Sequence, residues 1–390
     1  MDERDLPRIL GRDALGDLLA ALVDDGHELI GPTVRDDAIV HDVITSIDDL
    51  PAGRTDEQAP GRYRLRRTEG ADAGALFAYA TGPSAWKREL FPPRVRTATV
   101  ELTHEGLRFA SGPADPPVRR RAFIGVRGCD LEAIAIQDRV FLGGPHAPDH
   151  DYAARRADVF IVAVHCTHPA ATCFCTSMGT GPAARGAYDL ALTELTPDAP
   201  DAPAPPGDDH RFVVEIGSPG GRRILDRVEH RAATPTEIDR ARRRVEDAAA
   251  RIDRRMDTRD LPRRLAERLE HPRYDDVAER CLACGNCTLA CPTCFCSTER
   301  ESSGLDGRTA ERWREWDSCF DPDFSSLHGR PVRASVRARY RQWLVHKLSG
   351  WHEQFGTSGC TGCGRCLTWC PAGIDLTEEV AALLADGDAS

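Results

Sequence analysis

The chain begins with a pattern that predicts an amphipathic helix. Residues 13–25 carry apolar side chains at the spacing of one helical face, and Gly26 is placed to end the helix. The apolar positions on this face are Leu15, Leu18, Leu19 and Leu22. Short runs typical of strands follow, separated by turn residues, at 28–30, 38–43, 63–67, 75–79 and 97–102. We expect these runs to form a mostly antiparallel sheet.

The middle of the chain changes to continuous apolar runs. Residues 123–126 and 159–164 are such runs, and between them Asp130 is placed to cap a helix that ends at Phe141. This order predicts a strand-helix-strand unit with parallel strands and a right-handed connection. Further strands are expected at 188–195 and 211–216. The Pro-, Asp- and Ala-rich segment between them, 196–210, is interpreted as a long solvated loop.

A helix start at Thr234 marks the predicted domain boundary. Thr234-Pro235-Thr236-Glu237 combines a capping threonine, a proline at the first helical position and a capping-box glutamate. One apolar face of a long helix follows, formed by Ile238, Ala241, Val245, Ala249, Ile252 and Met256. We therefore divide the chain into a mixed α/β domain at 1–232 and an all-helical domain at 233–390, which makes the fold class α+β.

Size and charge narrow the possible functions. At 390 residues the chain is long enough for two domains with cores of their own. The formal net charge of -11 argues against nucleic acid as a partner, because duplex binding depends on Lys and Arg contacts to phosphates. The N-terminal residues lack the pattern of a secretory signal, and no run is as long and apolar as a membrane span. We expect a cytoplasmic protein whose cysteines serve as metal ligands rather than as disulfides.

Two cysteine-rich stretches share one spacing. The first motif runs Cys281-Leu-Ala-Cys284-Gly-Asn-Cys287-Thr-Leu-Ala-Cys291-Pro292, and the second runs Cys360-Thr-Gly-Cys363-Gly-Arg-Cys366-Leu-Thr-Trp-Cys370-Pro371. This C-x2-C-x2-C-x3-C-P spacing brings three thiolates around one 4Fe-4S cluster and sends the fourth cysteine to a neighbouring cluster. Two copies predict two 4Fe-4S clusters and make residues 233–390 a ferredoxin-type domain.

The exchange of the fourth cysteine sets the expected ligands. Cluster 1 is expected to be held by Cys281, Cys284, Cys287 and Cys370. Cluster 2 is expected to be held by Cys360, Cys363, Cys366 and Cys291. Zinc is the main alternative, but zinc sites usually combine two separated cysteine or histidine pairs, not a run of four with a terminal proline. A disulfide framework would be an unusual use of so many cysteines in a reducing compartment.

Seven cysteines lie outside the two motifs. Cys129 and Cys166 each follow one of the two predicted parallel strands, at the sheet edge where open α/β sheets bind ligands. One hypothesis is a third metal site formed by Cys129, Cys166, Cys173 and Cys175. The alternative is that these small side chains pack in the core. Three more remain: Cys294, Cys296 and Cys319. They could supplement the two clusters or shield them, but simple packing is the favoured interpretation.

The sequence contains no fingerprint for a bound nucleotide. Neither a G-x-G-x-x-G after a strand nor a Walker loop is present, so neither a dinucleotide nor a nucleoside triphosphate is expected to bind. No catalytic residue is predicted. These features are typical of a subunit that conducts electrons within an oxidoreductase complex and carries no reaction of its own.

The chain resembles the beta subunit of cytoplasmic NADP-linked nickel-iron hydrogenases (sulfhydrogenases) and the related A subunit of anaerobic sulfite reductase. The resemblance rests on both cysteine motifs and on N-terminal segments at 31–33, 61–63, 86–87, 91–93, 125–130 and 173–179. Gly128 departs from the proline expected at its position. The resemblance implies an electron-transfer subunit that relays electrons between a flavin and NAD(P)H-binding subunit and a nickel-iron hydrogenase catalytic subunit.

Two alternatives stay open at the level of sequence. A relay to the catalytic subunit of anaerobic sulfite reductase fits the same residues. A self-contained oxidoreductase, in which the N-terminal cysteines bind a metal or a thiol substrate, is the other alternative. Turnover by the isolated chain distinguishes this last function from a relay.

Overall fold

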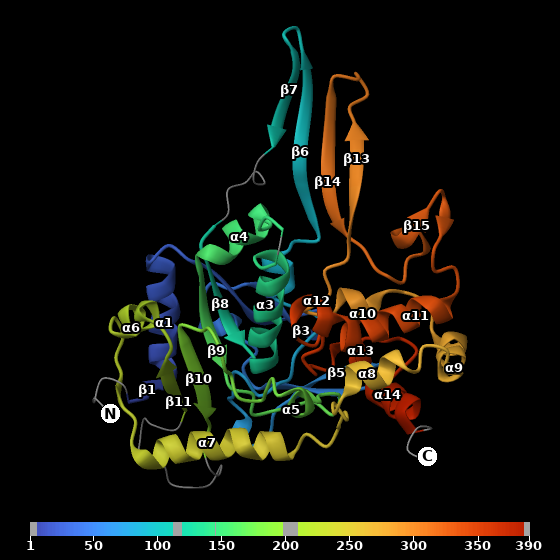
Figure 1. Ribbon diagram of the computed structural model, residues 1–390. Helices are drawn as coiled ribbons and strands as arrows, with labels where there is room; N and C mark the ends of the chain where they lie inside the picture. The colour runs from blue at the N-terminus through green and yellow to red at the C-terminus, as the bar shows by residue number, and fades with distance from the viewer. Residues whose placement is uncertain (1–5, 112–118, 145, 198–209, 386–390) are drawn as a thin grey trace.

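The computed structural model describes residues 6–111, 119–144, 146–197 and 210–385. Its largest element is an eight-stranded sheet, which occupies the left half of Figure 1. In spatial order the strands are β12 (Arg231–Ala232), β1 (Arg8–Gly11), β11 (Arg211–Ile216), β10 (Leu190–Leu195), β9 (Val159–Val164), β8 (Arg121–Val126), β2 (Glu28–Arg35) and β3 (Ala38–Val43). The four strands β10, β9, β8 and β2 are mutually parallel, and the outer strands pair antiparallel.

The predicted strand-helix-strand unit is confirmed. β8 and β9 are adjacent and parallel, and the connection between them contains α3 (Gly128–Phe141) and the shorter α4 (His150–Ala157). Cys129 therefore lies just beyond the end of β8, and Cys166 lies just beyond the end of β9. The carboxyl ends of these strands face the C-terminal part of the chain, which is how the sheet positions its cysteines near the two motifs.

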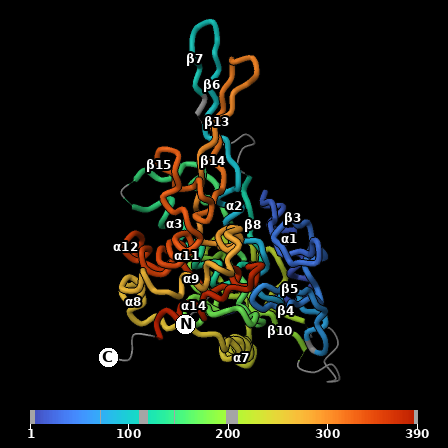
Figure 2. Tube along the Cα trace, turned by 90° about the vertical axis from the view of Figure 1, so that its right-hand side faces the viewer, coloured from blue at the N-terminus to red at the C-terminus, as the bar shows by residue number. Residues whose placement is uncertain are grey.

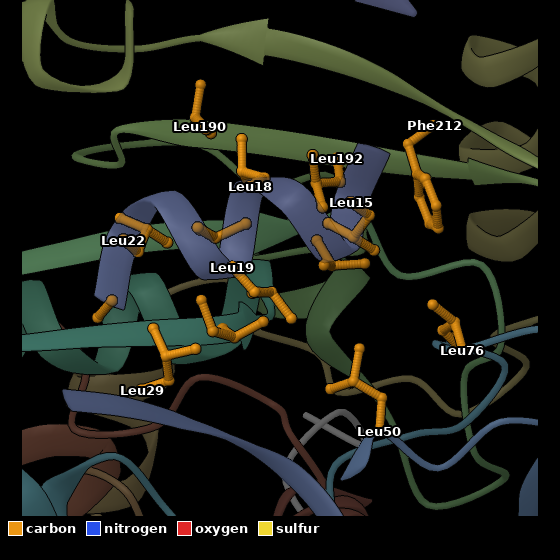
Figure 3. Packing of buried hydrophobic residues seen from close by; sticks show 14 of the residues in the cluster. Leu15, Leu18, Leu19, Leu22, Leu29, Leu50, Leu76, Leu190, Leu192 and Phe212 are labelled. Atoms are coloured by element: carbon orange, nitrogen blue, oxygen red, sulfur yellow. The ribbon is translucent and has the colours of Figure 1, made fainter. Parts of the chain in front are cut away.

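The two faces of the sheet are covered by different helices. The predicted first helix is α1 (Arg12–Asp24), and its leucines pack against Leu190, Leu192 and Phe212 on one face, as Figure 3 shows. On the other face Leu131 and Ile134 of α3 join a second core with residues of β8 and β9. Burial of both faces accounts for the continuous apolar runs in the parallel strands.

One predicted strand is wrong. Residues 75–79 are buried but belong to no strand, and the chain bends at three of the five positions. Their backbone is held by a side chain, because the two carboxylate oxygens of Glu194 accept hydrogen bonds from the N–H groups of Leu76 and Phe77 at 2.6 and 2.8 Å. An apolar run predicts burial, but it does not specify whether backbone or side-chain acceptors satisfy the buried N–H groups.

The other early strands pair antiparallel as predicted, but they are divided among three sheets. β2 and β3 belong to the large sheet, while β4 (Arg54–Ala59) and β5 (Arg62–Arg67) form a separate hairpin. β6 (Arg94–Thr103) and β7 (Gly106–Ser111) belong to a third sheet. Most of the predicted loop at 196–210 lies outside the described residues.

The helix predicted at the domain boundary is α7 (Pro235–Ala250). Thr234 and Glu237 form the expected capping box. The helix ends at Ala250, so the predicted face does not continue to Ile252 and Met256. Ile252 instead packs against Cys129 and Cys175, and Met256 joins the core of the C-terminal part. The irregular stretch after α7 thus connects the sheet to the cysteine-rich region, and the boundary at residue 233 stays a prediction.

The C-terminal part holds seven α-helices in the residues described. They are α8 (Leu261–Ala266), α9 (Arg273–Arg280), α10 (Asn286–Leu289), α11 (Val336–Val345), α12 (Trp351–Phe355), α13 (Arg365–Thr368) and α14 (Leu376–Ala385). A π-helical turn, His346–Gly350, joins α11 to α12. Further elements of the chain are α2 (Lys87–Leu90), α4 (His150–Ala157), α5 (Cys175–Met178), α6 (Pro219–Leu225), β15 (Ser326–Leu327) and β16 (Arg330–Pro331).

The expectation of an all-helical C-terminal domain is wrong. β13 (Ser297–Ser303) and β14 (Thr309–Trp316) form a hairpin between the two cysteine motifs. β14 pairs with β6, so the third sheet has the order β13-β14-β6-β7 and joins strands from both parts of the chain. Figures 1 and 2 show this sheet, called the β arm below, rising from the body. The turn glycines Gly304 and Gly307 carry a hairpin signal that the helical prediction overlooked.

No described helix combines the length and the hydrophobicity that a membrane crossing requires.

Candidate iron-sulfur centres

The two cysteine motifs share one backbone conformation. In each motif the residues two and four positions after the first cysteine have positive φ angles. They are Ala283 (51°) and Gly285 (76°) in the first motif, and Gly362 (67°) and Gly364 (78°) in the second. The turns aim equivalent amides at sulfur, because the N–H groups of Ala283 and Gly362 donate to Cys281 Sγ and Cys360 Sγ, each at 3.4 Å. Such N–H groups stabilise negative charge on a thiolate.

The first centre combines cysteines from both motifs. Cys281, Cys284 and Cys287 line one cavity together with Cys370 and Cys366 of the second motif. The cavity is otherwise largely apolar, with Phe320, Tyr340, Trp343, Ile374 and Leu376 in its lining. Burial raises the pKa of the Cys287 thiol well above its ordinary value, and the neighbouring sulfurs of Cys281 and Cys370 add to the increase. The fourth cysteine of the second motif therefore lies with the first three of the first motif.

The second centre has the reciprocal arrangement. Burial raises the pKa of Cys366 well above its ordinary value, and Cys360, Cys363 and Cys291 raise it further because their sulfurs lie nearby. Burial also raises the pKa of Cys360 to about 12, with the same two neighbours, Cys363 and Cys291, acting in the same direction. Cys291 of the first motif is thus placed with the triplet of the second motif.

The two centres adjoin. Cys291 contributes to the raised pKa of Cys287, and Cys287 contributes to the raised pKa of Cys366. A sulfur raises the pKa of another thiol only when the two lie close together. Cysteines of the first centre therefore lie close to cysteines of the second. Cys284 is exposed at the outer side of the first centre, whereas Cys291 and Cys360 of the second are buried.

The donor sets fit 4Fe-4S clusters. Each centre brings four soft thiols together from two turns that also supply N–H donors to sulfur, which is the chemistry that iron-sulfur cages use. Within the described ranges, no three His, Cys, Asp or Glu side chains are arranged to hold a single metal ion. The assignment of the eight cysteines as ligands stays a prediction.

Comparison with known proteins agrees with this geometry. A family model described as "4Fe-4S dicluster domain" matches residues 280–374. The chain is also 34% identical over 301 residues to Sulfhydrogenase 2 subunit beta of Pyrococcus furiosus, an alignment that covers 74% of this chain and 82% of that relative. The chain belongs to the sulfhydrogenase beta-subunit family. No solved structure matches it.

This sulfhydrogenase-type beta subunit buries a lysine against its second centre. Lys347 lies in the π-helical turn, and its Nζ donates to Cys291 Sγ at 3.2 Å, Cys294 Sγ at 3.4 Å and Gly359 O at 3.0 Å. Burial acts to lower the pKa of Lys347, but the sulfurs of Cys291 and Cys294 outweigh burial and raise it well above its ordinary value. The ammonium therefore stays charged beside an expected ligand.

Lys347 was not recognised from the sequence. It lies in a helical stretch that contains no recognisable motif. The π-helical turn that directs its side chain into the protein has no sequence pattern that would predict it. A second buried lysine, Lys87, approaches the same region from the N-terminal part. Its Nζ donates to Thr288 O and Leu289 O, both at 3.3 Å, and lies 4.0 Å from the centre of the Trp316 ring. These two bonds hold the end of α10 that leads to Cys291.

The second motif of this beta subunit also packs tightly against the N-terminal part. Phe174 N donates to Gly362 O at 2.9 Å. A Cβ atom on Gly362 would lie 2.7 Å from the backbone of Cys175, and one on Gly364 would lie 2.5 Å from Thr172 O. The glycines of the motif are therefore required for this contact as well as for their φ angles.

The four N-terminal cysteines lie beside the second motif. Cys129 and Cys175 pack with Cys363, and Cys173 Sγ lies 3.9 Å from Cys363 O. Burial raises the thiol pKa of all four: Cys129, Cys166, Cys173 and Cys175. The sequence predicts that Cys129 and Cys166 lie at the carboxyl ends of two parallel strands. In the structure Cys363 of the second motif packs against this edge of the sheet. A third metal site at these four residues stays a prediction.

Proposed function

We propose that this protein relays electrons through two 4Fe-4S clusters between a flavin and NAD(P)H-binding subunit and the catalytic subunit of a nickel-iron hydrogenase. When bound, each cluster supplies a one-electron couple. The observation that carries the proposal is the reciprocal placement of Cys370 and Cys291, each with the other motif's triplet. We infer the ligands of the first cluster to be Cys281, Cys284, Cys287 and Cys370, and those of the second to be Cys360, Cys363, Cys366 and Cys291.

The surrounding protein holds the two centres close together. It buries the second centre more deeply than the first, which has an exposed cysteine. The first cavity has a largely apolar lining, and Lys347 places a positive charge next to Cys291 of the second centre. Burial and nearby charge are the protein's means of setting cluster potentials. Two adjoining centres with different surroundings are suited to pass electrons in sequence.

The exposed side of the first centre is the candidate contact with another redox subunit. Cys284 is exposed there, and Leu282 and Leu289 of the same motif are 68% and 44% exposed. Exposed apolar residues next to a redox centre suit a contact that excludes water. The relative's name describes it as a subunit, which supports a multisubunit assembly for this family member as well. We place the complex in the cytoplasm.

Reconstitution of the full chain tests the proposal. After anaerobic incubation with iron and sulfide, we expect about eight irons and eight acid-labile sulfides per chain, because two 4Fe-4S clusters require that number. Reduction should give the electron paramagnetic resonance signal of reduced 4Fe-4S clusters. Co-purification with a nickel-containing subunit supports the hydrogenase assignment, and co-purification with a siroheme subunit instead contradicts it. A chain that stays colourless contradicts the relay itself.

A further inference from the structure

Three cysteines outside both motifs line one pocket beside the second centre. Cys294, Cys296 and Cys319 share this pocket, of about 360 Å³, with Lys347. All three are partly exposed. A pocket of this volume is in the range that binds small molecules. The sulfurs are therefore open to a small reactant from solvent.

Cys296 and Cys319 lie next to each other in this pocket. Each side chain shifts the pKa of the other, which requires the two sulfurs to be neighbours. The base of the β arm holds the two residues in place, because Asp317 N donates to Cys296 O at 2.9 Å and Ser297 pairs with Trp316. The two sulfurs are neighbours across an antiparallel pair of chain segments.

The surroundings assign different roles to the two sulfurs. The neighbouring Cys319 thiol lowers the pKa of Cys296 to about 7, and the charges of Lys347 and Lys87 act in the same direction against burial. Cys296 in turn raises the pKa of Cys319 far above its ordinary value. The lowered pKa favours the thiolate, the nucleophilic form, at Cys296, and the raised pKa favours the protonated thiol at Cys319.

We propose that Cys296 and Cys319 form a dithiol that exchanges with small disulfides entering this pocket. The Cys296 thiolate attacks one sulfur of the small disulfide, forms a mixed disulfide and releases one thiolate. The sulfur of Cys319 then attacks Cys296 Sγ, which closes the Cys296–Cys319 disulfide. The second half of the small molecule leaves as a thiol, with the proton that Cys319 carried. The protein pair loses two electrons and the small disulfide gains them.

The pocket indicates which small disulfides fit. Lys347 and Arg333 both contribute to its lining and bring positive charge to it. A disulfide that carries carboxylates is therefore favoured over an uncharged one. The reaction goes beyond electron transfer through the clusters and does not require it. Cys296 directly precedes β13 and Cys319 follows β14, so the disulfide ties together the two strands of the hairpin at their base.

Trapping with glutathione disulfide tests the proposal on the full chain with its clusters loaded, under anaerobic conditions. After alkylation of free thiols and proteolysis, mass spectrometry should detect a disulfide-linked pair of peptides that contain Cys296 and Cys319. In Cys319→Ser the reaction should stop at the first step and leave glutathione attached to Cys296. Cys294→Ser is the matched control in the same pocket, and it should still form the Cys296–Cys319 link.

Two results overturn the proposal. One is that Cys296 in Cys319→Ser acquires glutathione no faster than the pocket neighbour Cys294 does. The other is that Cys296→Ser or Cys319→Ser lowers the iron content of the loaded chain, because the thiols are then ligands. A wild-type chain that binds no iron contradicts the proposed relay and not the dithiol. The trapping result is then judged separately from the iron content.

Discussion

Arg365 and Asp130 form a buried ion pair that joins the second cysteine motif to the start of α3. The two guanidinium nitrogens lie 2.8 and 3.2 Å from the two carboxylate oxygens, and both side chains are at most 2% exposed. Arg365 Nε also donates to Gly82 O at 3.0 Å. The loop between Cys363 and Cys366 is thereby anchored to α3, the helix that contains Cys129.

Removal of one partner should destabilise the chain strongly. Asp130→Ala leaves the Arg365 charge buried without its carboxylate, and loss of one member of a buried pair typically costs about 3 to 5 kcal/mol. Chemical unfolding of the loaded protein measures the change. Asp42→Ala is the control, because Asp42 pairs with Arg35 at the surface and both side chains are about half exposed. Its effect should be about 0.5 kcal/mol. Equal effects of the two substitutions contradict the structural role of the buried pair.

The charge of Lys347 should raise the potential of the second cluster. Lys347→Met removes a positive charge next to Cys291 and so disfavours the reduced, more negative state. We expect the midpoint potential of that cluster to fall by on the order of 60 mV, which corresponds to about 1.4 kcal/mol for one electron. Redox titration followed by electron paramagnetic resonance measures it.

Lys347→Arg is the matched variant, because it keeps the charge. Its potential should lie closer to the wild-type value than that of Lys347→Met. If both variants shift the potential equally, packing and not charge sets the effect of this residue.

The two equivalent motif glycines should differ in their tolerance of a side chain. Gly285 and Gly364 have nearly equal φ angles, so the backbone strain of an alanine is similar at both. A Cβ on Gly364 meets the fixed backbone of Thr172, whereas one on Gly285 meets the side chain of Ser318, at 3.0 Å or more. We therefore expect Gly364→Ala to lose the second cluster, about half of the iron, and Gly285→Ala to lose less. Equal iron contents contradict the packing of the second motif against residues 172–175.

Much of the chain was predictable from local pattern. The leucine spacing of α1, the apolar runs of β8 and β9 and the capping box of α7 each state a local preference that the fold satisfies. The exchange of Cys291 and Cys370 between the two centres, which the motif spacing predicts, stays a prediction. These features depend on residues close together in the sequence, where periodicity and turn chemistry are informative.

The remaining features depend on contacts between distant segments. The β arm needs β6 to find β14, with Thr99 opposite Glu311, and neither strand alone indicates its partner. The same holds for Asp130 and Arg365, which are 235 positions apart. Lys347 was missed because a lysine in an amphipathic stretch is ordinarily solvated. Only the packed structure shows that its neighbours are sulfurs.

Iron content in paired cysteine variants tests the exchange of ligands most directly. Cys370 belongs to the second motif by sequence but to the first centre by position. Cys284→Ser and Cys370→Ser should therefore damage the same cluster, and the double variant should keep about four irons per chain, those of the intact second cluster. Cys363→Ser combined with Cys370→Ser should lose both clusters. If Cys284→Ser with Cys370→Ser removes all the iron while Cys363→Ser with Cys370→Ser keeps about four, the two motifs do not exchange their last cysteines.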